Sequence, residues 1–204
     1  MIVNNWKKWN FLQREELDLK KIIKIAIVLL VILSIVLFII LNKKTIMKAI
    51  YVIKYSEYVE KYSREYGVDK YLIYATIKAE SNFDEKAESG KGAKGLMQLM
   101  DSTGKEIAKG LDMSIDNDDL FNPEINIKLG TKYISKMLQK YTSMELALAA
   151  YNAGSGNVDS WINSNKIKAN GSDIENIPFK ETNNYVRKIL KDYRIYKELY
   201  EQEG

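Results

Sequence analysis

The stretch LIYATIKAESNF, residues 72–83, has the pattern of a short apolar helix that ends at a carboxylate, Glu80. Three, four and seven positions before Glu80 lie Ile77, Thr76 and Ile73, so Glu80 projects from the face of the helix that we expect to be buried. Burial of a carboxyl group without a cationic partner raises its pKa. We therefore expect Glu80 to hold a proton near neutral pH, which is what a general acid requires.

The residues that the chain lacks narrow the chemistry further. Its 204 residues include no histidine and no cysteine. This composition excludes Ser-His-Asp and Cys-His nucleophile systems, imidazole and thiolate metal sites, and disulfides. Acidic pairs such as Asp118-Asp119 lack the ligand spacing of a calcium loop, so we expect no metal and no cofactor. An enzyme without histidine and cysteine must use Asp, Glu, Tyr or Lys for proton transfer, and Glu80 is the best placed residue of these types.

An apolar segment near the amino terminus predicts a membrane span. Residues 22–41 are twenty positions with one charge, Lys24, close to the end of the run. Twenty helical residues reach roughly 30 Å, the thickness of a bilayer hydrocarbon core. No polar face interrupts the run, as it would in a core helix, and residues 42–45, NKKT, are not the small-x-small cleavage site of a signal peptide. We expect an uncleaved transmembrane signal anchor in the lipid bilayer.

The basic residues on both sides of this segment predict its orientation. Six lie before it or at its start, and three follow it, namely Lys43, Lys44 and Lys48. Because cytoplasmic flanks carry the excess of Lys and Arg, residues 1–21 are predicted to form a short cytoplasmic tail. Residues 42–54 would be a juxtamembrane segment, and residues 55–204 a globular domain outside the cytoplasm. The chain would then be a single-pass protein of the cell membrane.

Charge gives no indication of a nucleic-acid partner. Residues 1–41 hold six of the 31 basic residues and three of the 27 acidic ones, which leaves 25 against 24 in the remainder. A balanced domain lacks the basic surface that nucleic-acid binding needs, so we expect no such partner.

The pattern beyond the span predicts an all-α domain with little or no sheet. Apolar residues recur at spacings of three and four, and the chain has only two prolines. An irregular loop that could border a cleft is expected at about 163–178. The predicted helices cover about 46–65, about 70–81 with Asp69 as N-cap, about 102–109, a segment beginning near Pro123, a segment from a Thr142–Glu145 capping box to Gly154, and about 181–201.

Residues 90–95, GKGAKG, match the dinucleotide-binding pattern G-x-G-x-x-G. They follow a helix and a polar stretch rather than a strand, and no βαβ unit surrounds them. We interpret them as a turn whose glycines allow close backbone approach, which brings residues 95–98, GLMQ, beside the helix of Glu80.

A series of short motifs follows Glu80 along the chain in a fixed order. They are ESNF at 80–83, Ser89, GAKGLMQLM at 92–100, LFNPEINI at 120–127, AYNAG at 150–154 and IPFKETNNYV at 177–186. In order and spacing, from about residue 55 to about residue 195, the chain resembles lytic murein transglycosylases of the soluble-lytic-transglycosylase (SLT) type, which have a lysozyme-like fold. Asp84-Glu85 and Asp101 depart from the Asn-Pro pair and the proline common in the family, at turns rather than at catalytic groups.

The resemblance implies cleavage of the β-1,4 bond between N-acetylmuramic acid and N-acetylglucosamine in the glycan strands of peptidoglycan. No water is used, and the products end in 1,6-anhydro-muramic acid. Glu80 would be the single catalytic group, first as acid and then as base.

The same resemblance assigns substrate-binding roles to seven residues. Ser89 and Gln98 would orient the acetamido group or the carboxyl of Glu80, unless they only cap the local turn. Tyr151 and Asn152 would line the cleft, and the hydroxyl of Tyr185 would lie near the catalytic carboxyl. Met97 and Met100 would floor the sugar sites, with filling of the core as the alternative role.

Three other interpretations remain open on the sequence. A hydrolase of goose-lysozyme type would cleave the same bond with water. A catalytically idle protein would only bind peptidoglycan as an envelope scaffold. In the third, the span would serve mainly to recruit an envelope protein complex through the helix expected at 46–65.

Overall fold

A computed structural model describes the backbone of residues 2–201 and the side chains of residues 20–201. The chain divides into two compact units, Met1–Ile50 and Tyr51–Gly204, each of which is described by itself below. The described residues form helices and no sheet, which confirms the predicted all-α class. Extended pairing within this part of the chain is limited to two isolated bridges, Glu88 with Lys94 and Lys94 with Leu99.

The first unit consists of helices α1 (Ile2–Leu41) and α2 (Lys43–Ile50). Within α1, the segment Lys20–Leu41 has a mean hydropathy of 3.3 and is not buried by the rest of the protein. Among the described residues, it is the one helical segment long and apolar enough to cross a membrane. It contains the predicted segment 22–41. The hydroxyl of Ser34 donates to the carbonyl of Val31 at 2.8 Å, so this polar side chain is satisfied by its own helix.

The helix predicted at about 46–65 is two helices, so this prediction is wrong. α2 ends at Ile50, and α3 (Ser56–Tyr66) begins after a link in which Tyr55 has a φ of 57°. The physical reason is Tyr51, whose hydroxyl donates to the buried carboxylate of Asp192 at 2.9 Å. This contact belongs to the second unit, which therefore begins at Tyr51 rather than at the expected residue 55.

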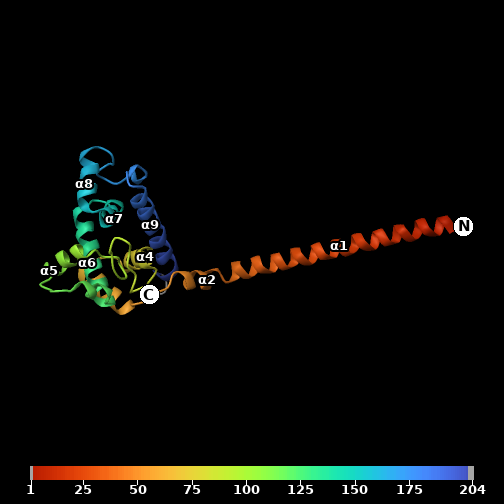
Figure 1. Ribbon diagram of the computed structural model, residues 1–204, viewed down its shortest axis with the longest axis horizontal. Coiled ribbons are helices and arrows are strands. Elements are labelled where there is room, and N and C mark those ends of the chain that lie inside the picture. The colour runs from red at the N-terminus through yellow and green to blue at the C-terminus, as the bar shows by residue number, and fades with distance from the viewer. Residues whose placement is uncertain (1, 202–204) are drawn as a thin grey trace. The chain divides into compact units, whose positions relative to one another are not determined.

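The second unit is a bundle of helices in which α4 packs against α9, α3 against α6, and α7 against α6, α8 and α9 (Figure 1). The helices after α3 are α4 (Lys70–Ser81), α5 (Asp101–Lys109), α6 (Pro123–Lys140), α7 (Met144–Ala153), α8 (Ser155–Asn163) and α9 (Lys180–Tyr200), with short 3-10 turns at Asn117–Phe121 and Ile174–Asn176.

Helix α4 is the central element of this unit, and its predicted bounds are confirmed. Residues 71–77 are all buried, so the helix contacts protein around nearly its whole circumference. Asp69 caps it, because its carboxylate accepts from the amide of Tyr71 at 2.8 Å. It ends where Asn82 and Phe83 both adopt positive φ, at 50° and 67°. Glu80 consequently lies in the last turn of a largely buried helix.

Two details around α7 differ from the sequence prediction. Ser143, not Thr142, caps this helix by accepting from the amide of Leu146 at 3.2 Å. The hydroxyl of Thr142 instead donates to the carbonyl of Ala169 at 3.1 Å, so a contact distant in sequence takes it away from the helix end. After Gly154, with a φ of 85°, the chain forms the unpredicted helix α8, whose buried Val158 and Trp161 face the bundle.

Candidate active site

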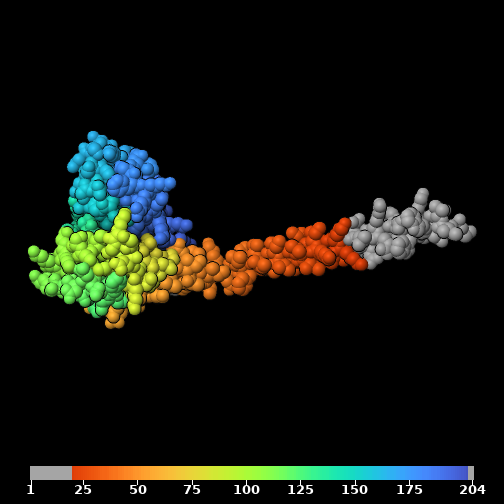
Figure 2. Space-filling model, viewed as in Figure 1, coloured from red at the N-terminus to blue at the C-terminus, as the bar shows by residue number. Residues whose placement is uncertain are grey.

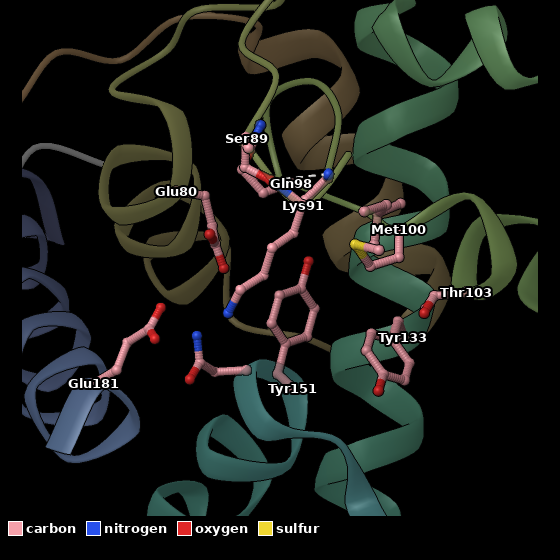
Figure 3. A pocket seen from close by; sticks show the side chains of 13 residues that line it. Glu80, Ser89, Lys91, Gln98, Met100, Thr103, Tyr133, Tyr151 and Glu181 are labelled. Atoms are coloured by element: carbon pink, nitrogen blue, oxygen red, sulfur yellow. Dashed lines mark hydrogen bonds between the residues drawn. The ribbon is translucent and has the colours of Figure 1, made fainter. Parts of the chain in front are cut away.

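The side chain of Glu80 lines a cavity of about 460 Å³ in the second unit (Figure 3). Its walls come from the end of α4, the following turn, and helices α5, α6, α7 and α9. In the space-filling view, the yellow and green part of the chain and the cyan and blue part, both of which line the cavity, lie on two sides of this unit (Figure 2). The lining residues are Glu80, Ser89, Gly90, Lys91, Ala93, Gln98, Leu99, Met100, Thr103, Tyr133, Tyr151, Asn152 and Glu181.

The carboxyl of Glu80 is desolvated by the protein around it. This burial raises its pKa to about 7, while the hydrogen bond from Tyr185 and the charge of Lys188 act in the opposite direction and the charge of Glu181 adds to the increase. The hydroxyl of Tyr185 donates to Oε1 of Glu80 at 2.6 Å. A carboxyl group with a pKa near 7 can both donate and accept a proton at neutral pH.

Two tyrosines meet around this carboxyl from different helices. Tyr185 extends from α9, and Tyr151 from α7, where its hydroxyl donates to the carbonyl of Met97 at 2.8 Å. Burial raises the pKa of both phenols well above the ordinary value, so both remain protonated hydrogen-bond donors. The ring of Tyr151 also packs against that of Tyr133 on α6, with centroids 5.0 Å apart.

The turn before α5 reaches the cavity because Ser81 holds it against α4 and Asn126 holds it against α6. Gly95 has a φ of +72°, and a Cβ at this position would lie 2.2 Å from the carbonyl of Leu120, so only glycine fits. The amide side chain of Asn126 bonds to the amide of Met97 at 2.7 Å and to the carbonyls of Lys94 and Leu120 at 2.9 and 2.7 Å. On the other side, the hydroxyl of Ser81 in α4 donates to the carbonyl of Leu96 at 2.8 Å. The predicted approach of this turn to the helix of Glu80 is confirmed.

Ser89 and Gln98 both line the cavity, and their hydrogen bonds within the protein hold the turn. The hydroxyl oxygen of Ser89 accepts from the amide of Ala93 at 2.9 Å. The side-chain nitrogen of Gln98 donates to the carbonyls of Ala87 and Gly95, each at 3.0 Å. Gln98 also has a φ of 46°, an unusual value for a residue with a side chain.

The two methionines lie in different surroundings. Met100 is 41% exposed and lines the cavity. Met97 is fully buried and is not part of the cavity wall, which differs from its expected place on the floor of the sugar sites. Its side chain packs on Gly130 of α6, where a Cβ would come within 2.4 Å of the sulfur. The missing side chain at Gly130 therefore gives Met97 its space in the core.

Asn152 is an exposed residue on the cavity wall, and its side-chain oxygen Oδ1 accepts a hydrogen bond from the hydroxyl of Thr182 at 2.8 Å. The expected irregular loop at about 163–178 contributes nothing to the walls of this cavity.

Seven lining residues were not predicted as site residues from the sequence: Gly90, Lys91, Ala93, Leu99, Thr103, Tyr133 and Glu181. Glu181 lies inside the motif IPFKETNNYV, so its position was a usable signal. In the sequence, Tyr133 cannot be distinguished from the other apolar positions of α6. Its place at the cavity follows only from the packing of α6 against α7. Among the residues described, no group of three or more His, Cys, Asp or Glu is placed to hold a metal.

Comparisons with known proteins identify related domains. Residues 57–174 match the family model described as the transglycosylase SLT domain. The chain is 32% identical over 140 residues to the soluble lytic murein transglycosylase of Salmonella typhimurium, which covers 67% of this chain and 22% of that protein. It is 39% identical over 127 residues to the membrane-bound lytic murein transglycosylase C of Edwardsiella ictaluri, covering 57% of this chain and 35% of that protein.

Solved structures show the same relationship. An inactive mutant of the lytic transglycosylase Slt of Pseudomonas aeruginosa superposes with a TM-score of 0.67 at 34% identity, over 72% of this chain and 24% of that one. The soluble lytic transglycosylase of Escherichia coli superposes with the same TM-score at 28% identity, over 74% and 25% of the two chains. The chain thus spans about a quarter of the length of the soluble relatives that it matches.

Proposed function

The chain belongs to the family of proteins with a transglycosylase SLT domain, and we propose that it is a membrane-anchored lytic transglycosylase that cleaves the glycan strands of peptidoglycan. The observation that carries this proposal is the carboxyl of Glu80, with a pKa of about 7, at the wall of a cavity large enough for sugar rings. The names of the relatives support the choice of substrate.

The proposed reaction begins with Glu80 as general acid. Its proton passes to O4 of N-acetylglucosamine while the bond from that oxygen to C1 of N-acetylmuramic acid breaks. Positive charge then develops at C1, where the acetamido group of the substrate itself stabilises it. Ser89, Gln98 and Asn152 line the cavity with groups able to bind this acetamido group.

In the second step, Glu80 acts as base. The hydroxyl at C6 of the same muramic acid attacks C1, and its proton returns to the carboxylate of Glu80, which closes the 1,6-anhydro ring. No water is consumed, and the enzyme ends in its starting protonation state. The hydrogen bond from Tyr185 to Oε1 stabilises the carboxylate between the two steps and fixes its orientation.

The apolar helix Lys20–Leu41 would anchor this activity to the membrane, with the amino terminus in the cytoplasm and residues 51–204 on the outer side. A membrane-bound relative supports the anchoring, and the excess of basic residues before the span supports the orientation.

A direct test is to digest purified peptidoglycan with the full-length protein in detergent and to weigh the released muropeptides. A transglycosylase yields muramic acid ends that are lighter by one water than reducing ends. Glu80→Gln should release no muropeptides, and it serves as the control for contaminating wall enzymes. Absence of any cleavage by the wild-type protein would leave a peptidoglycan-binding scaffold as the better interpretation.

A muramidase is the second candidate function, and Glu181 is the observation that favours it. Its carboxylate lines the same cavity as Glu80, and hydrolases of glycosidic bonds commonly use two carboxylates. Reducing muramic acid ends in the same mass spectra would establish hydrolysis and exclude the single-carboxylate reaction.

A further inference from the structure

Helix α2 begins one turn residue, Asn42, after the end of the apolar span, and it exposes apolar side chains of its own. All eight of its residues are described, and none of them is buried. Ile46 and Ile50 are four positions apart and so share a face of the helix, where they are 37% and 51% exposed. The proposed anchor accounts for exposed apolar residues as far as Leu41, but not for these two.

The opposite face of α2 is basic. Lys44 and Lys48 are also four positions apart, and each is two positions from an isoleucine of the apolar face. Two positions turn a helix by about 200°, so the lysine pair and the isoleucine pair lie on opposite faces. Lys43 adds a positive charge at the start of the helix, and no acidic residue occurs between Asp18 and Glu57. α2 is therefore a strictly cationic amphipathic helix.

The place of α2 in the chain brings it to a membrane surface. Its eight residues extend at most about 12 Å beyond the span, and the headgroup layer that begins outside the hydrocarbon core is roughly 5 to 7 Å deep. Helical side chains lean toward the amino-terminal end of their helix, which for α2 is the membrane side. The long stems of its three lysines can therefore carry their ammonium groups back to the level of the phospholipid phosphates.

Charge decides what covers this helix. Each lysine near an anionic membrane surface favours binding by roughly fivefold. A tilt of α2 at Asn42 would then place Ile46 and Ile50 at the boundary between headgroups and acyl chains. A second copy of α2 would instead bring three further positive charges into the contact, and a zwitterionic surface offers no net negative charge.

We propose that α2 binds anionic phospholipids, with Lys43, Lys44 and Lys48 on the headgroups and with Ile46 and Ile50 at the acyl boundary. The inference rests on the proposed membrane anchoring and goes beyond it, because it gives the protein a preference for anionic lipid that an apolar span does not supply. It does not depend on the proposed reaction.

The test follows a nitroxide label on Ile50→Cys in the full-length protein, reconstituted in nanodiscs. The chain contains no cysteine, so the label attaches at this position alone. The discs contain either phosphatidylcholine alone or equal parts of phosphatidylglycerol and phosphatidylcholine. We expect the label to be accessible to dissolved oxygen in the mixed discs and to a water-soluble nickel complex in the zwitterionic ones. High salt should make the mixed discs resemble the zwitterionic discs.

The variant Lys43→Gln/Lys44→Gln/Lys48→Gln tests the charged face. Loss of three charges should weaken the contact with mixed discs by roughly a hundredfold, so that the label reports water instead of lipid. Equal accessibility of the label in the two kinds of disc, or a lipid contact that survives the loss of all three lysines, would overturn the inference.

The matched control is Lys86→Gln/Lys105→Gln/Lys109→Gln, which removes the same charge from exposed lysines of the second unit. It should keep the label in the lipid of the mixed discs. A loss of lipid contact in this control equal to that in the α2 variant would show that net charge, rather than the basic face of α2, controls the contact, and would also overturn the inference.

A label on Leu33→Cys, near the middle of the span, separates the inference from the anchoring. It should lie in hydrocarbon in both kinds of disc. With Leu33→Cys in hydrocarbon, an Ile50→Cys label that reports water in both kinds of disc would reject lipid binding by α2 and leave the anchor standing. A label at Leu33→Cys that reports water would overturn the anchoring and the inference together.

Hydrogen exchange of residues 43–50 in the unlabelled protein gives a second measurement. Exchange should be slower in the mixed discs than in phosphatidylcholine discs, because contact with the headgroup layer protects the helix. Equal exchange rates in the two kinds of disc would contradict the inference.

Discussion

At the residue scale, Glu80 is subject to two opposing influences. Burial destabilises its carboxylate, whereas the hydroxyl of Tyr185 and the charge of Lys188 stabilise that same form. The result is a pKa of about 7, so that neither protonation state is strongly disfavoured at neutral pH. A residue that acts first as acid and then as base needs this balance.

We predict that Glu80→Gln abolishes cleavage and stabilises the fold at alkaline pH. The folded carboxyl has a pKa of about 7, against about 4.3 when unfolded. Between these values the native state binds more protons, so stability falls as pH rises, by about 4 kcal/mol in total. Glutamine removes this loss and can still accept the hydrogen bond from Tyr185.

Urea unfolding of residues 42–204 at pH 4 and pH 8 measures this effect. The difference in unfolding free energy between the Glu80→Gln variant and the wild type should grow in favour of glutamine by roughly 3 to 4 kcal/mol between these pH values. Parallel pH profiles for the two proteins would show that Glu80 is an ordinary hydrated acid.

Tyr185→Phe should move the pH dependence of cleavage. In the wild type, kcat should fall as pH rises through about 7, because Glu80 loses the proton that it must donate. Loss of the hydroxyl removes a bond that favours the carboxylate, so the pKa rises and the fall in kcat shifts to higher pH.

The matched control is Tyr193→Phe on the same helix, where the hydroxyl donates to Asp69 at 2.8 Å, outside the cavity. Its pH profile should coincide with that of the wild type. A shift to lower pH in Tyr185→Phe would contradict the assigned role of this hydrogen bond.

At the scale of elements, the site depends on a turn with no regular secondary structure. Residues 95–98 are held by Asn126 of α6 on one side and by Ser81 of α4 on the other. The side chain of Asn126 is fully buried and uses its carbonyl oxygen and both N–H groups. α6 thus positions the cavity wall that contains Gln98.

We expect Asn126→Ala to destabilise the second unit by about 3 kcal/mol, since it leaves the amide of Met97 and the carbonyl of Leu120 buried without partners. It should also lower kcat, because the turn that contains Gln98 loses its support. Thermal unfolding of residues 42–204 measures the first effect. Asn122→Ala removes only the cap of α6 and should cost about 1 kcal/mol, and equal losses in the two variants would argue against a special role for Asn126.

The accuracy of the predicted elements follows the range of the interactions that determine them. The bounds of α4 and its Asp69 cap depend on neighbours in sequence, and both were predicted correctly. The break between α2 and α3 depends on Asp192, which lies 141 positions after Tyr51. The cap of α7 went to Ser143 because Thr142 bonds to Ala169, 27 positions away. Local patterns contain no information about such partners.

At the scale of the whole molecule, the first residues of the second unit pack against its last helix, α9. Tyr51 is buried, and its ring meets that of Tyr196 edge-on at 5.3 Å. The hydroxyl of Tyr200 donates to the carbonyl of Tyr51 at 2.7 Å, and that of Tyr196 to the carbonyl of Val52 at 3.0 Å. Residues 51–55 are therefore part of the folded unit, although they follow directly on α2.

Three truncations test this boundary. Residues 42–204 and 51–204 should unfold with the same free energy, since neither lacks any contact of the second unit. Residues 56–204 should be less stable by about 3 kcal/mol or more, because the fragment loses a buried aromatic residue and leaves the carboxylate of Asp192 buried without its partner. Urea unfolding gives all three values, and equal stability of the last fragment would place Tyr51 outside the fold.

The sequence by itself determined the all-α class, the apolar segment 22–41, the helix of Glu80 and the order of the family motifs. These features depend on composition, on periodicity and on residues close together in the chain. Only the tertiary structure decided which side chains share the cavity. The resemblance implied that Tyr185 lies near Glu80, 105 positions away, but not that Met97 turns into the core toward Gly130. Nor did it imply that Lys91 and Glu181 line the same cavity. The packing of helices fixes such neighbours, because it brings together surfaces whose residues have no regular relation along the sequence.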